Sequence, residues 1–460
     1  MTGEDKTQEL ELARSVLGSG ELRHFFVDLW RRTRIDWSFV GDRLQKELRT
    51  KRDLNSRTRR WVGDVLYGMI RHLRRIDEAL KAGGVRTSTG APDELRLLTY
   101  LMLEGPLSAQ DALQHSSGSK AAKRVDWEAV AAFDKSIEHE RKTWRRVALQ
   151  FSFPDWLAKR LASDLGEEAV AFAEAVNRRA EVCVRANVSV GSLDELEASL
   201  TAEGVSFERG KYAELALRLH TGQDVHSLEA FRAGAFEVQD EASQMIADLA
   251  FAPALSVADS AKPVMVDYCA GAGGKTLAWA SRLGNRGRLI ACDTDDRKLA
   301  ELRRRARRAG ATNIRTVVLD GESHTAMDEL HQSVGCVLVD APCSGMGALR
   351  RHPETRWRVT AGEVKRLSKL QGKILASASD LVAPGGALLY ATCTVLRAEN
   401  RQVVEEFLAA HKDFSLRRLA DVLPEQAADI ADASGDYMSM TPHRHNTDGF
   451  FAAVLQRNAD

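Results

Sequence analysis

Cysteine is scarce in this chain, with six residues among 460. So few thiols cannot make a disulfide framework for a chain of this length. None of them forms a Cys-x-x-Cys pair, the spacing typical of structural zinc sites, so we expect no metal. The chain also lacks an excess of positive or negative charge. The formal net charge is zero, which excludes a global field that would draw the protein onto nucleic acid.

Long apolar runs are also absent. No uninterrupted apolar stretch approaches the ~20 residues that a membrane-spanning helix needs. The opening residues 1–12 are polar and lack the hydrophobic region of a signal peptide. We therefore expect a monomeric cytoplasmic protein without a membrane partner, in a reducing compartment that keeps a catalytic thiol usable.

The length exceeds what one hydrophobic core usually fills, so we expect several domains. Residues 1–145 predict a helical domain, because apolar residues from Val62 to Leu80 recur at steps of three and four along one helix face. Gly83 ends that helix. The polar stretch 116–124 is typical of a linker.

Residues 146–235 predict a small α+β unit. A strand is expected at 182–188, and alternating leucines predict another at 215–219. Between them, Ser192 and Glu195 form a capping box ahead of a short amphipathic helix.

Strands and helices alternate from 236 to 460. The candidate strands are 264–268, 289–292, 315–319, 336–339 and 387–391. Residues 363–381 have apolar side chains at helical spacing. Repeated strand–helix units with apolar strands favour a doubly wound parallel sheet. The expected fold class is therefore α/β, with a Rossmann-like domain preceded by the α+β unit and the helical domain.

A glycine-rich loop, DYCAGAGGKT at 267–276, follows the first of these strands. Glycines let the backbone approach a ligand closely and begin a helix whose amides face it. A phosphate-binding P-loop needs glycine where Cys269 stands, and a dinucleotide-binding loop does not match at Thr276. A nucleoside cofactor without a pyrophosphate is the third interpretation.

Two carboxylates support a nucleoside cofactor. Asp293 lies about 20 residues after Gly273, where a carboxylate can bind the two hydroxyls of a ribose. Asp320 ends the third strand and could accept a hydrogen bond from an adenine amino group. S-adenosylmethionine has a ribose, an adenine and no phosphate, and it fits best. The groups expected to bind it are the loop residues Cys269, Ala270, Gly271, Ala272, Gly273, Gly274 and Lys275, together with Asp293 and Asp320.

Two cysteines, Cys343 and Cys393, follow the last two predicted strands. One helix-length segment separates these strands, and in an open parallel sheet a strand–helix–strand unit makes its two strands neighbours. Their carboxyl ends then open onto one crevice. We therefore expect both thiols and Asp340 to face one pocket.

This set of groups suits methyl transfer to carbon 5 of a pyrimidine. That carbon is not nucleophilic in the intact ring, but addition of a thiolate at carbon 6 makes it so. A base must then remove the carbon 5 proton, and an acid near ring N3 stabilises the charge that develops there. Cys343, Cys393 and Asp340 supply a thiol, a base and an acid, although the residues alone do not rank the two cysteines.

Two basic stretches stand out. The stretch 350–358 directly follows the Cys343 turn, and it holds the candidates for contact with RNA phosphates or bases. These candidates are Arg350, Arg351, Arg356 and Trp357. The other stretch, 297–308, is as compatible with a solvated helix face as with ligand contact.

Taken together, the motifs resemble the Sun/Fmu family of RNA cytosine-carbon-5 methyltransferases, and in particular the RsmB-type enzymes. The matching pieces, in family order, are RAN at 185–187, VQDEAS at 238–243, the loop at 267–276, Asp293, Asp320, DAPCSG at 340–345, RRHPE at 350–354 with Trp357, TC at 392–393, EN at 399–400 and DGFF at 448–451. One departure is Gly271-Ala272, where the family usually has Ala-Pro. We expect a looser loop there that keeps its backbone contacts.

The resemblance implies roles for these residues. Cys393 would be the nucleophile and Cys343 would assist product release. The loop 269–275 and the three strand-end aspartates would line the S-adenosylmethionine site. The α+β unit would be an RNA-recognition-like insertion. Residues 64–71 resemble the NusB-like helical domain of RsmB-type enzymes, which favours small-subunit ribosomal RNA as the substrate and a role in rRNA processing.

Other functions stay open on the sequence. The same chemistry could act on transfer RNA, or the chain could be a ribosome-assembly RNA-binding factor with vestigial catalysis. A P-loop nucleotidase is disfavoured by Cys269. The two cysteines could also exchange roles, as in DNA cytosine methyltransferases, where the cysteine after proline attacks the base.

Overall fold

The computed structural model describes residues 3–38, 40–87, 92–116, 124–220, 224–254, 263–320, 325–419, 423 and 425–459. The chain forms two compact units. The helical unit comprises Met1–Arg178 and Leu349–Ala361, and the α/β unit comprises Arg179–Ala348 and Gly362–Asp460. The chain therefore leaves the α/β unit once, for a short segment that completes the helical unit.

The helical unit consists of α1 (Gly3–Gly18), α2 (Gly20–Asp36), α3 (Val40–Thr50), α4 (Ser56–Ala82), α5 (Asp93–Leu103), α6 (Ala109–His115), α7 (Trp127–Ala131), α8 (Phe133–Ile137), α9 (Thr143–Gln150), α10 (Asp155–Leu165), α11 (Ala169–Ala175) and the later α17 (Thr355–Arg358). The long α4 begins where Asn55 caps it, with the side-chain oxygen accepting from Thr58 N at 2.8 Å. It ends before Gly83, and its apolar face is buried in the core of the unit. The helical prediction is confirmed, while the NusB likeness stays a prediction.

The two compact units divide the chain at other points than the predicted domain boundaries. The boundary after residue 145 falls inside α9, and α10 and α11 beyond it also belong to the helical unit. The boundary after 235 separates β4 (Phe236–Val238) from its own sheet, because β4 pairs with β1 (Val182–Ala186). Sequence texture changes near these points, but backbone pairing and packing decide which unit a segment joins. The predicted linker lies mostly outside the described residues.

The small α+β part of the α/β unit contains a four-stranded sheet. Its strand order is β2 (Ser206–Arg209), β3 (Ala216–His220), β1, β4, and each neighbouring pair is antiparallel. The helices α12 (Leu193–Ala202) and α13 (Glu229–Arg232) accompany it. The capping box is present as predicted, with Ser192 and Glu195 bonded reciprocally at the start of α12.

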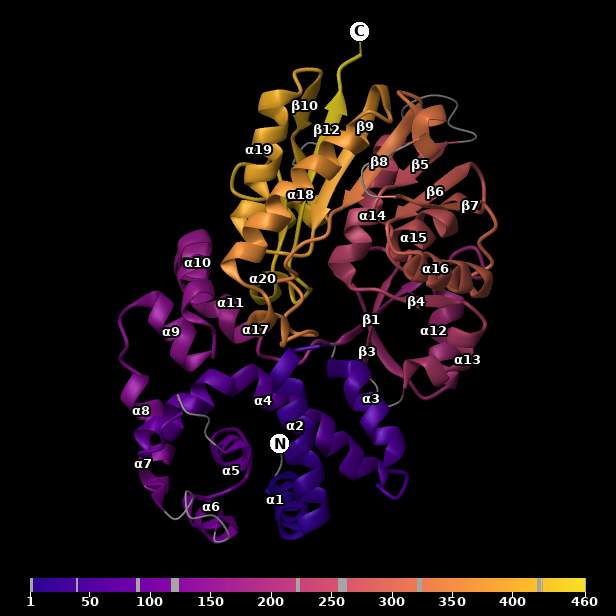
Figure 1. The fold of residues 1–460 in the computed structure, drawn as a ribbon. Coiled ribbons are helices and arrows are strands. Elements are labelled where there is room, and N and C mark those ends of the chain that lie inside the picture. The colour runs from indigo at the N-terminus through magenta and orange to yellow at the C-terminus, as the bar shows by residue number, and fades with distance from the viewer. Residues whose placement is uncertain are drawn as a thin grey trace. The chain divides into compact units, whose positions relative to one another are not determined.

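The large sheet has eight strands. Their order is β10 (Phe414–Arg417), β12 (Phe450–Arg457), β9 (Val382–Thr392), β8 (Val334–Asp340), β5 (Val264–Asp267), β6 (Arg288–Asp293) and β7 (Ile314–Val318), with β11 (Met438–Met440) paired to β12 (Figure 1). The strands from β5 to β9 are parallel and correspond to the five predicted strands. The strands β10, β11 and β12 pair antiparallel and were not predicted.

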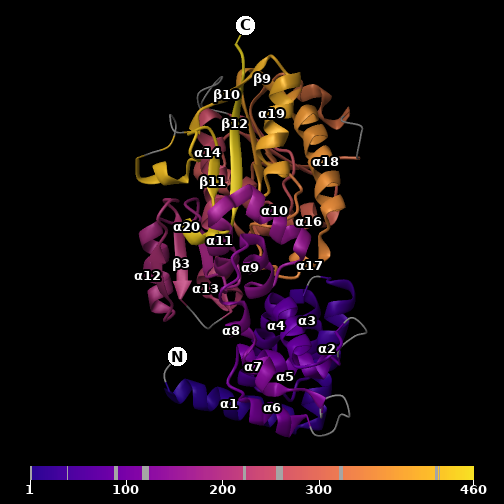
Figure 2. The same ribbon diagram turned by 90° about the vertical axis from the view of Figure 1, so that its left-hand side faces the viewer.

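Helices cover both faces of this sheet (Figure 2). On one face lie α14 (Glu241–Ala254) and α15 (Gly274–Leu283), and on the other lie α18 (Ala361–Ser379) and α19 (Arg401–Ala410). The remaining helices of the unit are α16 (Asp296–Arg308) and the short α20 (Pro442–His445). Because β5 has β6 on one side and β8 on the other, the crossovers diverge there, and doubly wound sheets bind ligands at the carboxyl ends of the strands at such a point.

Across the described ranges, no helix combines the length and the apolar character needed to cross a membrane. Nor do the described residues contain a group of three or more His, Cys, Asp or Glu side chains that could hold a metal ion.

Candidate functional site

The structure brings Cys343 and Cys393 together. The strands β8 and β9 are parallel neighbours, with Asp340 opposite Ala391. The turns that follow them place the two Sγ atoms 3.3 Å apart, which is within hydrogen-bond distance. The turns also bond through the backbone, because Gly347 N donates to Cys393 O at 2.9 Å. Both cysteines are half-buried and neither is in a disulfide.

The two thiols do not have equal surroundings. The hydrogen bond with Cys393 and burial together raise the pKa of Cys343 well above its ordinary value. The buried Glu399 carboxylate adds to the effect. At neutral pH, Cys343 therefore keeps its proton and can donate it to the neighbouring sulfur.

Lys275 and Asp340 form an ion pair next to the thiols. Lys275 Nζ lies 2.5 Å from Asp340 Oδ2 and 5.3 Å from the centre of the Phe450 ring. Burial lowers the pKa of Lys275, but the negative charge of Asp340 outweighs it, so that the net shift is upward. A field from Cys393 acts on Lys275 in the same direction. Lys275 is thus a permanent cation that holds Asp340 in place.

The glycine-rich loop runs from β5 into α15. Gly271 has a φ of 54°, a left-handed value that favours glycine, and its N–H donates to Asp293 Oδ2 at 2.9 Å. Gly273 has a φ of 83°, and a Cβ atom there would lie 2.4 Å from the Leu302 side chain. Glycine at 273 is therefore required both by the backbone and by the close approach of α16. α15 begins directly afterwards, at Gly274.

The other loop residues are held from several sides. Ala270 N donates to Cys292 O at 2.7 Å, and Ala272 O accepts from Arg305 Nη1 at 2.8 Å. Burial raises the pKa of the Cys269 thiol well above its ordinary value, so this thiol is not a nucleophile at neutral pH. The backbone contacts expected of the loop are present.

Aspartates occupy the ends of four adjacent strands. Asp293 and Asp340 end β6 and β8, Asp320 follows β7 and is exposed, and Asp267 ends β5. Asp267 Oδ2 accepts from Thr276 Oγ1 at 2.6 Å, whereas its buried Oδ1 has no hydrogen-bond partner. Burial raises the pKa of Asp267 to about 7. Asp267 was not predicted as a site residue, although its place at a strand end was the same signal that pointed to the others.

Sequence reasoning also left Glu399 without a role. Its carboxylate is fully buried and accepts from both Ser344 N and Ser344 Oγ, directly beside Cys343. The available signal was the Glu399-Asn400 pair among the motifs of the family resemblance, but no local pattern indicates where a buried carboxylate will find its partners.

The prediction that Arg356 contacts RNA is wrong, because its side chain is 0 % exposed. Arg356 Nη1 donates to Phe151 O at 3.2 Å and to Asn177 Oδ1 at 2.9 Å, and the guanidinium lies 4.3 Å from the centre of the Phe153 ring. Burial lowers the pKa of Arg356 to about 9. The residue is part of the interior of the helical unit.

Trp357 likewise packs within the helical unit. Its Nε1 donates to Ile70 O at 2.8 Å, and its ring stacks on Trp37 with centroids 6.1 Å apart. The Arg350 side chain is buried and its carbonyl accepts from Arg71. Arg351 is half-buried. Of the four predicted RNA contacts, Arg351 and Trp357 are half-buried, whereas Arg350 and Arg356 are buried.

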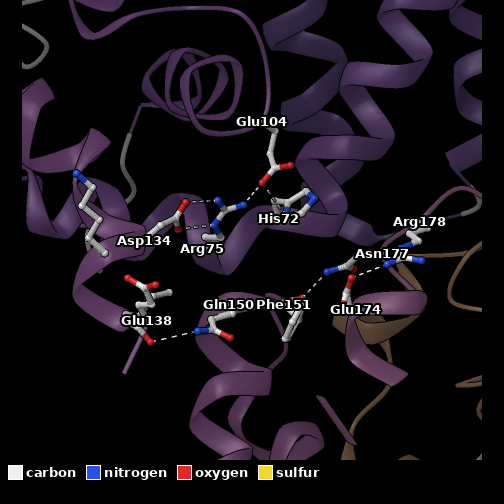
Figure 3. A pocket seen from close by; sticks show the side chains of 12 residues that line it. His72, Arg75, Glu104, Asp134, Glu138, Gln150, Phe151, Glu174, Asn177 and Arg178 are labelled. Atoms are coloured by element: carbon white, nitrogen blue, oxygen red, sulfur yellow. Dashed lines mark hydrogen bonds and ion pairs between the residues drawn. The ribbon is translucent and has the colours of Figure 1, made fainter. Parts of the chain in front are cut away.

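A pocket in the helical unit contains many charged side chains but offers no reactive group (Figure 3). Arg75 reaches both Asp134 and Glu104, so these charges compensate one another. Burial lowers the pKa of His72 to about 3, which leaves the imidazole neutral. Because its charges are paired and its histidine is neutral, we assign this pocket to the packing of the helices and not to a reaction.

Comparison with known proteins agrees with this geometry. The family model described as 16S rRNA methyltransferase RsmB/F matches residues 254–456, and the ferredoxin-like domain of RsmF/B-like methyltransferases matches 153–226. The chain is 33% identical over 319 residues to ribosomal RNA small subunit methyltransferase B of Xanthomonas campestris, which covers 69% of each chain.

The chain belongs to the RsmB/F family of methyltransferases. A putative methyltransferase of Mycobacterium tuberculosis is 32% identical, over 89% of this chain and 91% of that protein. The solved structure of PH0851 has 25% identity and a TM-score of 0.73, and it covers 94% of this chain and 97% of that chain. The family resemblance inferred from the motifs is confirmed. So are the Rossmann-like methyltransferase fold and the small α+β part.

Proposed function

We propose that this RsmB/F-family methyltransferase transfers a methyl group from S-adenosylmethionine to carbon 5 of a cytidine in small-subunit ribosomal RNA. The observation that carries the proposal is the pair of Sγ atoms 3.3 Å apart at the ends of β8 and β9, next to the Lys275–Asp340 ion pair. Methyl transfer to oxygen or to an exocyclic nitrogen needs no thiol nucleophile. The relatives named as small-subunit ribosomal RNA methyltransferases favour that RNA over transfer RNA.

The strand ends fit S-adenosylmethionine. This cofactor carries a positive charge, a ribose diol and an adenine. In the protein, the buried Asp267 Oδ1 at the end of β5 lacks a hydrogen-bond partner. Asp293 would accept from the ribose hydroxyls, Asp320 from the adenine amino group, and the amides of the glycine-rich loop would face the ligand. When bound, the cofactor supplies an electrophilic methyl group.

The attack is assigned to Cys393. Cys393 loses its proton to solvent, and its sulfur adds to carbon 6 of the cytosine ring while Cys343 stays protonated beside it. Asp340, with 28% of its side chain exposed, would face the base near N3, where the paired Lys275 cation offsets the negative charge that develops. Carbon 5 thereby becomes the nucleophile that takes the methyl group.

Release is assigned to Cys343. The hydrogen bond with Cys393 is the largest cause of its raised pKa, and this cause disappears once Cys393 is bonded to carbon 6. Cys343 can then lose its proton to solvent and take the proton from carbon 5. The electrons of that C–H bond re-form the ring double bond, and the bond between carbon 6 and Cys393 breaks. Cys393 then takes a proton from solvent, and the cysteine pair returns to its starting state.

The first test uses a denaturing gel of the Cys343→Ala variant mixed with unmodified ribosomal RNA and S-adenosylmethionine. A slow band that survives denaturation, and is lost when Cys393 is also replaced, supports the assigned roles. A band from Cys393→Ala instead would reverse them. No band from either variant, with no methylation by the wild type, would contradict the proposal.

RNA contact is proposed for Arg351, whose side chain is half-buried, whereas that of Arg350 is buried. Replacing Arg351 with alanine should weaken RNA binding more than S-adenosylmethionine binding, with a smaller salt dependence. Equal RNA affinity of the variant and the wild type at several salt concentrations would contradict this contact.

Bisulfite sequencing of RNA from a deletion strain identifies whether ribosomal or transfer RNA loses its methyl group.

A further inference from the structure

One buried carboxylate joins the two cysteine turns. Glu399 ends the short 3₁₀ helix Arg397–Glu399, and its side chain is 0 % exposed. Its Oε1 accepts from Ser344 N at 2.8 Å and its Oε2 accepts from Ser344 Oγ at 2.5 Å. Ser344 directly follows Cys343, so Glu399 holds the first turn through the backbone and the side chain of one residue.

The second turn is held by the same group. Thr394, which directly follows Cys393, places its Oγ1 3.0 Å from Ser344 Oγ, and its hydroxyl also bonds to Glu399. Asn400, the residue after Glu399, donates from Nδ2 to Thr394 O at 2.9 Å. It also accepts from Thr392 Oγ1 at 2.5 Å. The residues on both sides of Cys393 are therefore tied to Glu399 or its neighbour.

Two further residues brace Glu399 from the surrounding elements. Gln371 of α18 donates from Nε2 to Glu399 Oε1 at 3.1 Å and to Pro342 O at 2.9 Å. Tyr390 of β9 donates from its hydroxyl to the Glu399 carbonyl at 2.6 Å. The residue before Cys343 is thus fixed as well.

An ionised carboxylate in such a place is costly unless it is fully hydrogen-bonded. Burial raises the pKa of Glu399, while its bonds to Ser344 oppose the shift. Packing alone would be served as well by an apolar side chain of similar volume. A buried polar network of this kind instead specifies one geometry. The S–H···S contact between the turns is weak, and the bond from Gly347 N to Cys393 O involves neither residue that flanks Cys343.

We propose that Glu399 is a positioning residue that sets the placement of Cys343 relative to Cys393. It acts through Ser344 and Thr394, and it has no contact with the reacting atoms. This inference rests on the proposed function for its catalytic meaning, but the thiol geometry that it concerns can be measured without RNA or cofactor.

The test is capture of the thiol pair by phenylarsine oxide, a trivalent arsenical that needs two neighbouring thiols. Two S–As bonds form, and both thiol protons leave with the arsenic oxygen as water. Glu399→Ala and Glu399→Gln are compared with the wild type, with Cys343→Ala as the blank. Glu405→Gln on the surface of α19 is the matched control, because the exposed Glu405 carboxylate forms an ion pair with the half-exposed Arg401. Melting temperatures confirm that each variant is folded at the assay temperature.

We expect capture at Cys343 and Cys393 to slow by about tenfold or more in Glu399→Ala, because the sulfurs lose their fixed separation. Glu399→Gln keeps one acceptor for Ser344 N and should fall between Glu399→Ala and the wild type, and Glu405→Gln should match the wild type. Folded Glu399 variants that capture the arsenical as fast as the wild type would overturn the inference, whatever the RNA assays show. If Glu399→Ala is unfolded, Glu399→Gln alone decides.

An activity assay separates the inference from the proposed function. With wild-type methylation established, Glu399→Gln should lower kcat and accumulate the RNA adduct while leaving the Kd for S-adenosylmethionine unchanged. A wild type without any adduct or methylation would remove the proposed function, while slowed arsenical capture would still establish the positioning role.

Discussion

Two neighbouring stretches of this chain, 340–345 and 350–357, both contain residues suited to chemistry, and the fold uses them differently. The first ends a strand of the α/β unit and places Cys343 3.3 Å from Cys393. The second belongs to the helical unit, where Arg356 and Trp357 bond to backbone carbonyls. A thiol at a strand end indicates a site, whereas arginine and tryptophan serve RNA contact and packing equally well.

The largest effect is expected from replacing Cys393, the partner of Cys343 in the first stretch. Cys393→Ala should lower methyl transfer at least about a thousandfold, because it removes the proposed nucleophile. The melting temperature should change little, since a half-buried thiol contributes little packing. The measurement is transfer of a labelled methyl group to unmodified small-subunit RNA. Cys183→Ala, which removes a buried cysteine of the small sheet, should keep the activity.

A second prediction concerns the carboxylate that ends β5. Asp267 has a pKa raised to about 7, so between pH ~4 and ~7 the folded protein keeps a proton that the unfolded chain releases. The stability contribution of Asp267 is therefore lost as pH rises through this window, by up to about 4 kcal/mol. Asp267→Asn should remove that loss, so that the variant gains stability relative to the wild type at pH 8 but not at pH 4.

Urea unfolding at both pH values measures this difference. Asparagine still offers an oxygen to Thr276, so the hydrogen bond is matched. The same pH slope in both proteins would show that Asp267 is ionised in the fold.

The third prediction tests the packing role of the second stretch. Arg356→Ala should lower the free energy of unfolding of the helical unit by about 2–3 kcal/mol, because carbonyl and amide oxygens around the guanidinium lose their donor. Tryptophan fluorescence follows this unit, since seven of the eight tryptophans lie in it and Trp279 alone lies in the α/β unit. The exposed Arg49→Ala is the control and should change stability by less than about 0.5 kcal/mol.

Loss of RNA affinity without loss of stability in Arg356→Ala would contradict the packing role and restore the original expectation for this residue.

The smallest expected effect is a difference in stability between alanine substitutions at two glycines of the cofactor loop. Gly271→Ala should cost about 1 kcal/mol, because a left-handed backbone is strained for alanine while open space surrounds the new Cβ. Gly273→Ala should cost more, since its Cβ would also clash with Leu302. Thermal unfolding of the pair checks the order. An equal cost would mean that α16 moves to accept the methyl group.

Much of the fold follows from local sequence. Apolar periodicity predicted α4 and the parallel strands, and Ser192 with Glu195 predicted the start of α12. The place of the thiols followed from connectivity, because a short strand–helix–strand unit leaves its two strands few ways to pair. Their roles came from the family resemblance and stay predictions until the adduct is tested.

What remained was decided by contacts between residues far apart in the chain. The antiparallel strands β10 and β12, the burial of Arg356 and the bonds of Glu399 each depend on partners tens to hundreds of residues away. Periodicity, capping and loop chemistry act within a few residues and can be recognised in a sequence window. The partner of a strand edge or a buried charge is selected only when the whole chain packs, because burial makes an unpaired polar group costly wherever its partner lies.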